Sequence, residues 1–453
     1  MPRLRHESLI LSLPLTLLPL AGLAGTAELT RALEGLGLEA QWRAEAPAPA
    51  GVELSGVTLR GPRALLRAEA MSWDQETGGL HLSAGSVVSA HPHAGSSSID
   101  FSRMSASGPA ALAFLGEFRP CEATPEDAIP VRLVQDRVII RGSRDLPGGI
   151  HSVERLDVAS METGFLVSGS ASCFLVPEFG ARGVVAMGAD RSRAHVGEIA
   201  FCASDLHGWS GDLQARLGDV AFFGPDGVWN GGIAALALDM AADIPTPLSL
   251  DGAGVVDALI DGSSSVRIEV RDADFRVRDI LSGSVPDPAV APEVSRVNLR
   301  ILVSHEGERV EVDLDGRASG LAAASLGMDL RLIRSDAVAG LGQLLGAGRA
   351  DVDLLERIAI AGAELRLENL GSVAILEALT GRSADAILAG ISARLRPFPP
   401  EIGAVVMEFA ERSLSGPAVL TMSPDDVLSF PRIAMTGMMR PGRLVSLLGL
   451  EVR

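Results

Sequence analysis

Lysine and tyrosine are absent from this chain of 453 residues, and tryptophan occurs only four times. The 39 basic residues are all arginines, and 57 acidic residues outnumber them, so that the formal net charge is −18. Nucleic-acid partners are disfavoured, because their phosphates attract basic surfaces and basic and aromatic residues do not interleave here. The same charge argues against a strong general attraction to anionic lipid headgroups, but it does not exclude acyl chains in an apolar groove.

Familiar catalytic motifs are missing as well. The sequence contains no Gly-x-Ser-x-Gly, and its serine runs at 96–98 and 263–265 lie in glycine-flanked, loop-like stretches. The run Gly340–Gly346 places its third glycine one residue late for a dinucleotide-binding loop, and it falls inside a helical pattern. No cysteine has an evident basic setting at a helix start. We therefore predict no cofactor and no enzymatic activity.

Candidate metal ligands are sparse. His91 and His93 flank a proline, and no further ligand follows until Asp100. A surface loop explains this pair better than a metal site does, since a structural metal site needs a complete set of ligands. We predict no metal site.

Aspartates two residues apart occur in three pairs. These are Asp272 and Asp274, Asp313 and Asp315, and Asp351 and Asp353. On a strand, this spacing places both carboxylates on one face, where they could bind Ca²⁺ or exchange protons. The same spacing is also the ordinary pattern of a solvated sheet face, and we favour that interpretation, so no catalytic residue is predicted.

The three cysteines are Cys121, Cys173 and Cys202. An oxidising compartment allows a disulfide. Cys173 and Cys202 both lie in strand-like runs and could pair across neighbouring strands, whereas Cys121 lies in a loop-like stretch. The alternative is that both remain small buried free thiols.

The first 27 residues resemble an export signal. Two early arginines precede an uncharged, leucine-rich segment at 8–27, which closes on small residues. We predict a signal peptide cleaved near Ala27 and a periplasmic location. The alternative is an uncleaved inner-membrane anchor, for which the segment is long enough, although Pro14 and Pro19 weaken a regular helix. Only in that case do we expect membrane contact.

Downstream of this segment, the expected architecture is mainly β. Glu28–Ala40 has the spacing of a short amphipathic helix, and the alternating Ala-Pro run at 46–50 indicates a linker. From 51 to 335, apolar and polar residues alternate with a period of two, which predicts antiparallel sheets with one covered face. Turn residues at 305–308 and 224–227 predict hairpins, and a third turn is expected at 188–193.

The pattern changes at residue 336, and the remaining 118 residues (336–453) mix helices and strands. Helices are expected at 336–347, 372–379, 402–412 and 440–448, and Ser383 is expected to cap a further helix. Strands are expected at 358–367 and 418–422. The predicted fold class is therefore mainly β with a helix-containing C-terminal part (α+β).

The segment 51–74, which contains Gly-Val-Glu-Leu-Ser-Gly-Val-Thr-Leu-Arg-Gly and ends in Met-Ser-Trp-Asp, resembles the opening of AsmA/TamB-type envelope proteins. The chain is also similar to an uncharacterised family of β-rich periplasmic proteins. The first resemblance implies extended, curved antiparallel sheets with an apolar groove and a role in lipid transport, and it carries over no catalytic residues. The chain departs from the family in being short and in having a helix-rich end.

The expected function follows from the alternating strands and from this resemblance. We expect a non-catalytic periplasmic envelope protein that binds or passes lipid, or another apolar ligand, along a β-groove. The first alternative is a structural or interaction scaffold whose apolar faces are all buried. The remote alternative is a carboxylate-based hydrolase.

Overall fold

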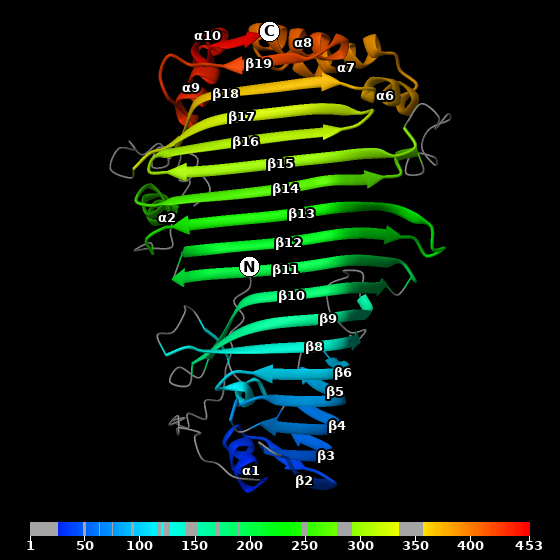
Figure 1. Cartoon of the computed structure of the whole chain (residues 1–453). Coiled ribbons are helices and arrows are strands. Elements are labelled where there is room, and N and C mark those ends of the chain that lie inside the picture. Colours follow the sequence, from blue (N-terminus) through cyan, green and yellow to red (C-terminus); the bar gives the residue numbers. More distant parts are fainter. Residues whose placement is uncertain are drawn as a thin grey trace. The chain divides into compact units, whose positions relative to one another are not determined.

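The computed structural model describes residues 26–48, 51–62, 64–74, 76–91, 95–115, 119–121, 127–141, 153–168, 173–188, 190–207, 209–246, 252–278, 292–334 and 357–453. The chain divides into two compact units, Met1–Arg182 and Gly183–Arg453, called unit 1 and unit 2 below. The expected fold class is confirmed, because each unit is built on an extended, curved, open sheet and most helices lie in the C-terminal part (Figure 1).

Unit 1 contains mostly antiparallel strands. Its elements are α1 (Thr26–Gly35), β1 (Glu39–Gln41), β2 (Ala44–Ala48), β3 (Gly51–Arg60), β4 (Ala64–Asp74), β5 (Leu80–His91), β6 (Gly95–Ser107), η1 (Ala111–Leu115), β7 (Arg119–Pro120), β8 (Ile129–Arg141), β9 (Val153–Ser168) and the first part of β10 (Cys173–Gly188).

Two N-terminal expectations are corrected. The helix ends at Gly35, and residues 39–41 form β1 opposite the end of β3. The expected linker is partly a strand, because β2 pairs with β3 from Ala44 opposite Ser55 to Ala48 opposite Gly51. Prolines are tolerated at the edge of a sheet, where a missing N–H costs no ladder bond.

The core of unit 1 is tightly closed. Leu54, Met71, Leu82 and Met104 face one another across β3, β4, β5 and β6, and each is at most 4% exposed. The apolar face of this sheet is therefore removed from water, as in an ordinary hydrophobic core.

A crease crosses the sheet of unit 1. The ladders are interrupted at Gly56, Glu69, Ala84, Ser102 and Arg137, and the buried side of the alternation switches there. Three of these residues (Gly56, Ala84 and Arg137) have positive φ. Aligned irregularities of this kind bend a sheet and increase its twist.

The crease yields a test of backbone strain at Ala84, an exposed residue with φ of 39°. Ala84→Gly is expected to raise the free energy of unfolding by about 1 kcal/mol, because glycine adopts this conformation without the steric cost that a Cβ brings. Ala241→Gly, at an exposed strand position outside the positive-φ set, is the control and should lower it by about 0.5–1 kcal/mol. Denaturant unfolding measures both, and equal destabilisation would contradict the strain.

Unit 2 continues with a second antiparallel series and ends in helices. Its elements are the remainder of β10, β11 (Arg193–His207), β12 (Ser210–Phe223), β13 (Trp229–Asp243), α2 (Gly252–Ile260), β14 (Ser263–Phe275), β15 (Ser295–Glu306), β16 (Arg309–Ala318), β17 (Ala322–Leu332), β18 (Ile358–Asn369), α6 (Ser372–Thr380), α7 (Ala384–Leu395), α8 (Pro400–Ser415), β19 (Ala418–Met422), β20 (Leu428–Ser429), α9 (Phe430–Met439), η4 (Pro441–Arg443), α10 (Leu444–Leu448) and β21 (Leu450–Val452).

The turn chemistry expected in unit 2 is confirmed. Glu306 pairs with Arg309 across the β15–β16 hairpin, and Gly307 has the positive φ (60°) that such a short turn requires. Gly227 donates to the carbonyl of Gly224 (2.9 Å) between β12 and β13, and Arg191 donates to that of Gly188 (3.0 Å) between β10 and β11.

The helices after β18 agree with most of the expected ranges. Ser383 caps α7 by accepting a hydrogen bond from the Ala386 N–H at 3.3 Å. Helices α2 and α9 were not expected from the sequence. Several features expected from the sequence lie outside the described residues. They are the helix at 336–347, the Gly340–Gly346 run, the pair Asp351 and Asp353, and the region boundary at 335–336.

Candidate ligand-binding face

An apolar face runs across unit 2 from β11 to β19. Strand register aligns its side chains into three adjacent rows. The middle row is Phe201, Ala215, Leu238, Ile268, Ile301, Leu314, Leu326, Leu365 and Leu420; the flanking rows are Ala203, Leu213, Met240, Val266, Val303, Val312, Met328, Ala363 and Met422, and Ile199, Leu217, Leu236, Val270, Leu299, Gly316, Ala324, Leu367 and Ala418.

The apolar face is only half covered, in contrast to the core of unit 1. Within the three rows, only Ala203 and Ala418 are fully buried, while Met240 is 40% exposed. The apolar face spans about 40 Å across its nine strands, at a strand spacing of about 4.8 Å. Large contiguous apolar patches on soluble proteins mark sites of interaction or ligand binding.

One end of the apolar face is sealed by α2. Val256 and Ile260 of this helix form a small core with Leu332, and Val310 and Ile358 pack against it. Arg357, just before β18, is 3% exposed and forms an ion pair with Asp257 of α2. The Arg357 Nε also donates to the Ile333 carbonyl at 3.0 Å, which links α2 to the ends of β17 and β18.

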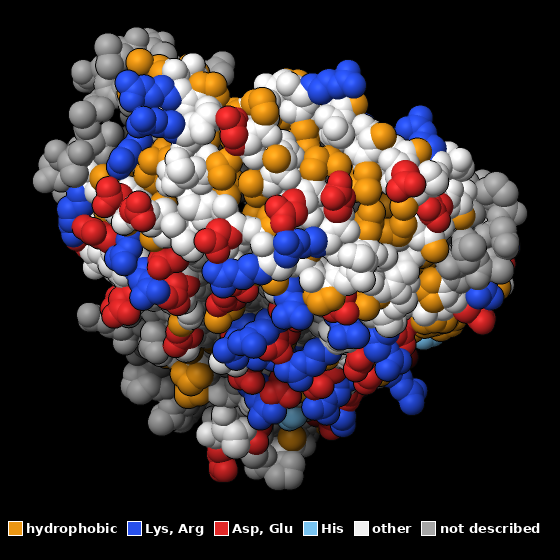
Figure 2. Space-filling view, turned by 90° about the horizontal axis from the view of Figure 1, so that it is seen from above, with side chains coloured by type: hydrophobic (Ala, Val, Ile, Leu, Met, Phe, Trp, Pro, Cys, Tyr) orange, Lys and Arg blue, Asp and Glu red, His pale blue; other side chains and the backbone are white. Residues whose placement is uncertain are grey.

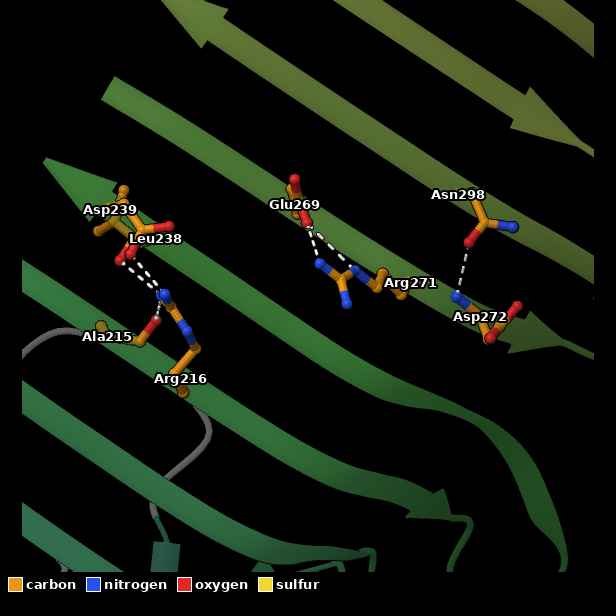
Figure 3. Close-up of polar contacts among 8 residues, drawn as sticks. All are labelled: Ala215, Arg216, Leu238, Asp239, Glu269, Arg271, Asp272 and Asn298. Carbon is orange, nitrogen blue, oxygen red and sulfur yellow. Dashed lines mark hydrogen bonds and ion pairs between the residues drawn. The ribbon is translucent and has the colours of Figure 1, made fainter. Parts of the chain in front are cut away.

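The opposite face of the sheet is charged, and ion pairs connect its strands. Arg216 of β12 bonds to Asp239 of β13, and Arg271 bonds to Glu269 within β14 (Figure 3). Figure 2 shows such arginine and acidic side chains interleaved in a band, with hydrophobic side chains gathered elsewhere. The hydrogen bond from Arg271 lowers the pKa of Glu269, as expected for a carboxylate beside a guanidinium.

The carboxylate pair Asp272 and Asp274 belongs to this network. Arg296 of β15 donates to both oxygens of Asp274, at 2.9 and 3.0 Å, and lies 3.6 Å from Asp272. The backbone of Asp272 has a positive φ of 48°. Its N–H donates a hydrogen bond to the Asn298 side chain at 2.9 Å (Figure 3). The sheet of unit 2 has a second crease, where the ladders of β11 to β15 are interrupted at Gly197, Asp219, Ala234, Asp272 and Asn298. The hydrogen bonds of the aspartate pair therefore stabilise this crease.

Asp274 should make stability depend on pH. The hydrogen bond from Arg296 lowers its pKa below the ordinary 3.8 in the folded state, so its contribution is complete above 3.8 and is lost as pH falls through the lowered value. Asp274→Asn should therefore reduce the loss of stability between about pH 5 and 2. Urea unfolding at several pH values measures this. The exposed Asp315→Asn is the matched control, and parallel curves for the two variants would contradict it.

A polar hollow of about 500 Å³ lies on the charged face at the ends of β12 to β16. Small side chains on three neighbouring strands form its floor, and longer charged ones line its rim. The floor consists of Ala241, Ser263, Ser265 and Ser304, and the rim includes Asp212, Asp243, Glu306, Arg309 and Glu311. The serine run at 263–265, which was expected to be a loop, is thus the start of β14.

His305 is buried beside this hollow. Its Nε2 lies 2.8 Å from the Gly307 carbonyl and its Nδ1 lies 3.5 Å from the Ser264 hydroxyl. Hydrogen bonding to a carbonyl assigns the proton to Nε2. His305 therefore secures the β15–β16 turn. Among the described residues, no group of three or more His, Cys, Asp or Glu side chains could hold a metal ion.

The candidate pairing of Cys173 with Cys202 is wrong, and so is the alternative that both are buried free thiols. Cys173 forms a disulfide with Cys121, with a Cα–Cα distance of 5.1 Å, and Cys202 is free and exposed. The physical reason is the short strand β7, which pairs in parallel with the start of β10 and brings Cys121 close enough for its N–H to donate to the Phe174 carbonyl at 2.8 Å. Cys202 instead lies opposite Gln214 on the charged face of unit 2.

The remaining candidate residues from the sequence are located as follows. His91 ends β5, and His93 lies outside the described residues. Asp313 and Asp315 are exposed on β16. Ala27 lies in the first turn of α1, and residues 1–25 lie outside the described residues.

Within the part of the chain that the structure describes, no helix has both the length and the apolar character needed to cross a bilayer.

Comparison with known proteins adds no family to this description. No protein-family model matches the chain, and no curated protein matches it significantly.

Proposed function

We propose that this chain is a non-catalytic protein of the bacterial envelope, acting in the periplasm, whose unit 2 binds lipid acyl chains or a similar apolar ligand along the apolar face. The observation that carries the proposal is the half-covered state of the three apolar rows, since unit 1 shows that the same chain can bury such rows completely. Covering apolar area with an apolar ligand contributes about 25 cal/mol per Å².

The charged face complements this proposal. Its ion pairs and exposed carboxylates keep one side of the sheet in water, so that a ligand would occupy the other side only. The periplasmic location rests on the export-like N-terminal residues, and the resemblance to AsmA/TamB-type proteins supports the lipid class. A scaffold that uses the apolar face to hold another envelope protein is the alternative.

Lipid binding can be tested with a double variant on the apolar face, at β13 and β15, and a control variant on the charged face of β15. The double variant Leu238→Thr with Ile301→Thr removes apolar area from the middle row while retaining residues that favour strands. We expect binding of a fluorescent fatty acid to weaken about tenfold or more. Arg300→Thr, on the charged face of β15, should leave it unchanged.

Mass spectrometry of the purified protein gives the second measurement. Co-purifying phospholipid that is lost in the double variant supports the proposal. A lipid-free protein that also fails to bind the fatty acid would exclude it and favour the scaffold.

One observation keeps the hydrolase alternative as a second candidate. The rim of the polar hollow gathers four carboxylates from two strand pairs, Asp212 and Asp243 from β12 and β13, and Glu306 and Glu311 from β15 and β16. Paired carboxylates can act as general acid and base. If the purified protein hydrolyses simple glycosides or esters, Glu306→Gln and Asp243→Asn should abolish that activity; retention in both variants would exclude this hollow.

A further inference from the structure

Helix α9 presents an apolar side to solvent. Met435, Met438 and Met439 stand at i, i+3 and i+4, which places them on one helix face. They are 43%, 78% and 76% exposed. Phe430 at the helix start and Val427 before it are also exposed. Apolar side chains gathered in this way mark an interaction site, and methionine is enriched at protein–protein interfaces.

The helix is held in place by its other side. A Cβ at Gly437 would lie 3.4 Å from the Leu444 side chain of α10, so this glycine permits close packing. Leu444 is buried, and α9 also contacts β18 and β20. The methionines therefore remain outward while the helix itself is packed.

The charged side chains around α9 are of both signs. Two carboxylates and one guanidinium lie near its start, and two guanidiniums and one carboxylate lie near its end, so the two ends carry −1 and +1 and the sum is zero. Glu451, which follows, is neutralised by its ion pair with Arg453. The six side chains are Asp425, Asp426 and Arg432 near the start, and Arg440, Arg443 and Glu401 near the end, where a Cβ at Gly442 would lie 3.1 Å from the Glu401 carboxylate.

These charges differ from those on the sheet. Arg216, Arg296 and Arg309 of the charged face all form ion pairs with neighbouring strands. Within the described part of the chain, none of the six side chains around α9 takes part in an ion pair. Charges of opposite sign therefore remain available to a partner at the two ends of the exposed methionine face.

This arrangement is complementary to itself. When a second copy is rotated by half a turn, the start of its α9 faces the end of the first α9, and the −1 end meets the +1 end. A parallel arrangement would bring like charges together. A neutral surface is also where two copies, each with a net charge of −18, approach with the least repulsion.

We propose that α9 is a docking surface for a second copy of this chain. The two helices pack antiparallel about a two-fold axis near Met435, with Met438 and Met439 of both copies between them. Asp426 of one copy then faces Arg443 of the other, because Met435 lies about midway between these two residues in the sequence. Two short helices form a small interface, so we expect a weak dimer with a Kd of about 10 µM.

Analytical ultracentrifugation of the full chain over a range of concentrations measures the dimer. Met438→Ser with Met439→Ser should raise the Kd about a hundredfold or more, because four buried methionine side chains are lost per dimer. Val228→Ser, at an exposed apolar residue in the β12–β13 turn, is the matched control and should leave the Kd unchanged. Circular dichroism checks that each variant is folded.

Charge reversal tests the antiparallel arrangement. Arg443→Glu and Asp426→Arg should each weaken self-association about tenfold, because like charges then meet across the two-fold axis. An equal mixture of these two variants should associate more tightly than either variant alone, since both cross-axis pairs become attractive in the mixed dimer. This gain requires a second copy as the partner, and a folding defect in either variant cannot produce it.

A cysteine near the axis locates the contact directly. A residue close to a two-fold axis lies beside its own counterpart, so Met435→Cys in a Cys202→Ser background should form a disulfide-linked dimer on mild oxidation. Val228→Cys in the same background should remain monomeric. Electrophoresis without reducing agent separates the two products.

Three results would overturn the docking surface. One is a chain that stays monomeric at every concentration up to its solubility limit, and another is a dimer whose Kd the methionine double variant leaves unchanged. The third is a monomer whose position 435 binds vesicles of phosphatidylglycerol, which would assign the surface to a bilayer. The proposal does not rest on the apolar face of the sheet, because the methionine double variant should bind the fluorescent fatty acid as the wild type does.

Discussion

Removing the Cys121–Cys173 disulfide is expected to lower the free energy of unfolding of unit 1 by about 4 kcal/mol. The bond closes a loop of 52 residues, and the chain entropy that such a loop restores to the unfolded state is of this size. The loss is large because native domains are stable by only about 5–15 kcal/mol. Guanidinium unfolding of Cys121→Ser with Cys173→Ser measures it.

Cys202 provides the matched control for this prediction. It is exposed and free, so Cys202→Ser should leave the unfolding midpoint unchanged. Alkylation of the unreduced protein should modify Cys202 alone, and reduction should bring the wild type to the stability of the double variant. A midpoint that is insensitive to reduction, or alkylation of Cys121 before reduction, would contradict the pairing.

The strands could be predicted from the sequence because alternation is a local property. Ile268 and Val270 alternate with charged residues, and β14 forms there as expected. The hairpins followed for the same reason, since Gly307 and Gly227 supply the positive φ of a tight turn. Local rules also placed α7, because Ser383 meets the requirement of a helix cap by itself.

The creases and the covering elements could not be predicted in this way. The sequence shows that the apolar positions change from even to odd numbers between Leu54 and Val57. That this change lies beside the similar changes at Ala84 and Arg137 depends on the register among several strands. Helix α9 was missed because Gly437, a poor helix former, lies inside it, although Pro431 is in the first turn, where proline is tolerated. The disulfide depends on the parallel pairing of β7, a contact between distant segments.

The same limit applies to the candidate site. The apolar content of each strand was evident, but how much of that apolar surface stays exposed to solvent is a property of the assembled sheet. Unit 1 and unit 2 have similar alternation, yet Met71 is buried and Met240 is 40% exposed. What distinguishes them is the packing around each sheet, which no single strand encodes.

Asp257→Ala is expected to destabilise unit 2 by about 3 kcal/mol. The partner Arg357 is 3% exposed, and removing the carboxylate paired with a buried guanidinium reduces the compensation of its charge in a medium of low polarity. The consequence reaches beyond α2, because this helix closes one end of the apolar face through Val256 and Ile260. Thermal and urea unfolding measure the loss.

The double variant Asp257→Ala with Arg357→Met separates this charge effect from a simple loss of packing. Replacing both partners removes the buried charge, so most of the lost stability should return. The exposed pair Arg334 and Asp261 is the control on the same helix end: Asp261→Ala should cost less than about 1 kcal/mol, because water screens that pair. If Asp257→Ala costs no more than Asp261→Ala, the ion pair does not anchor α2, and the sealed end of the apolar face must depend on the apolar contacts alone.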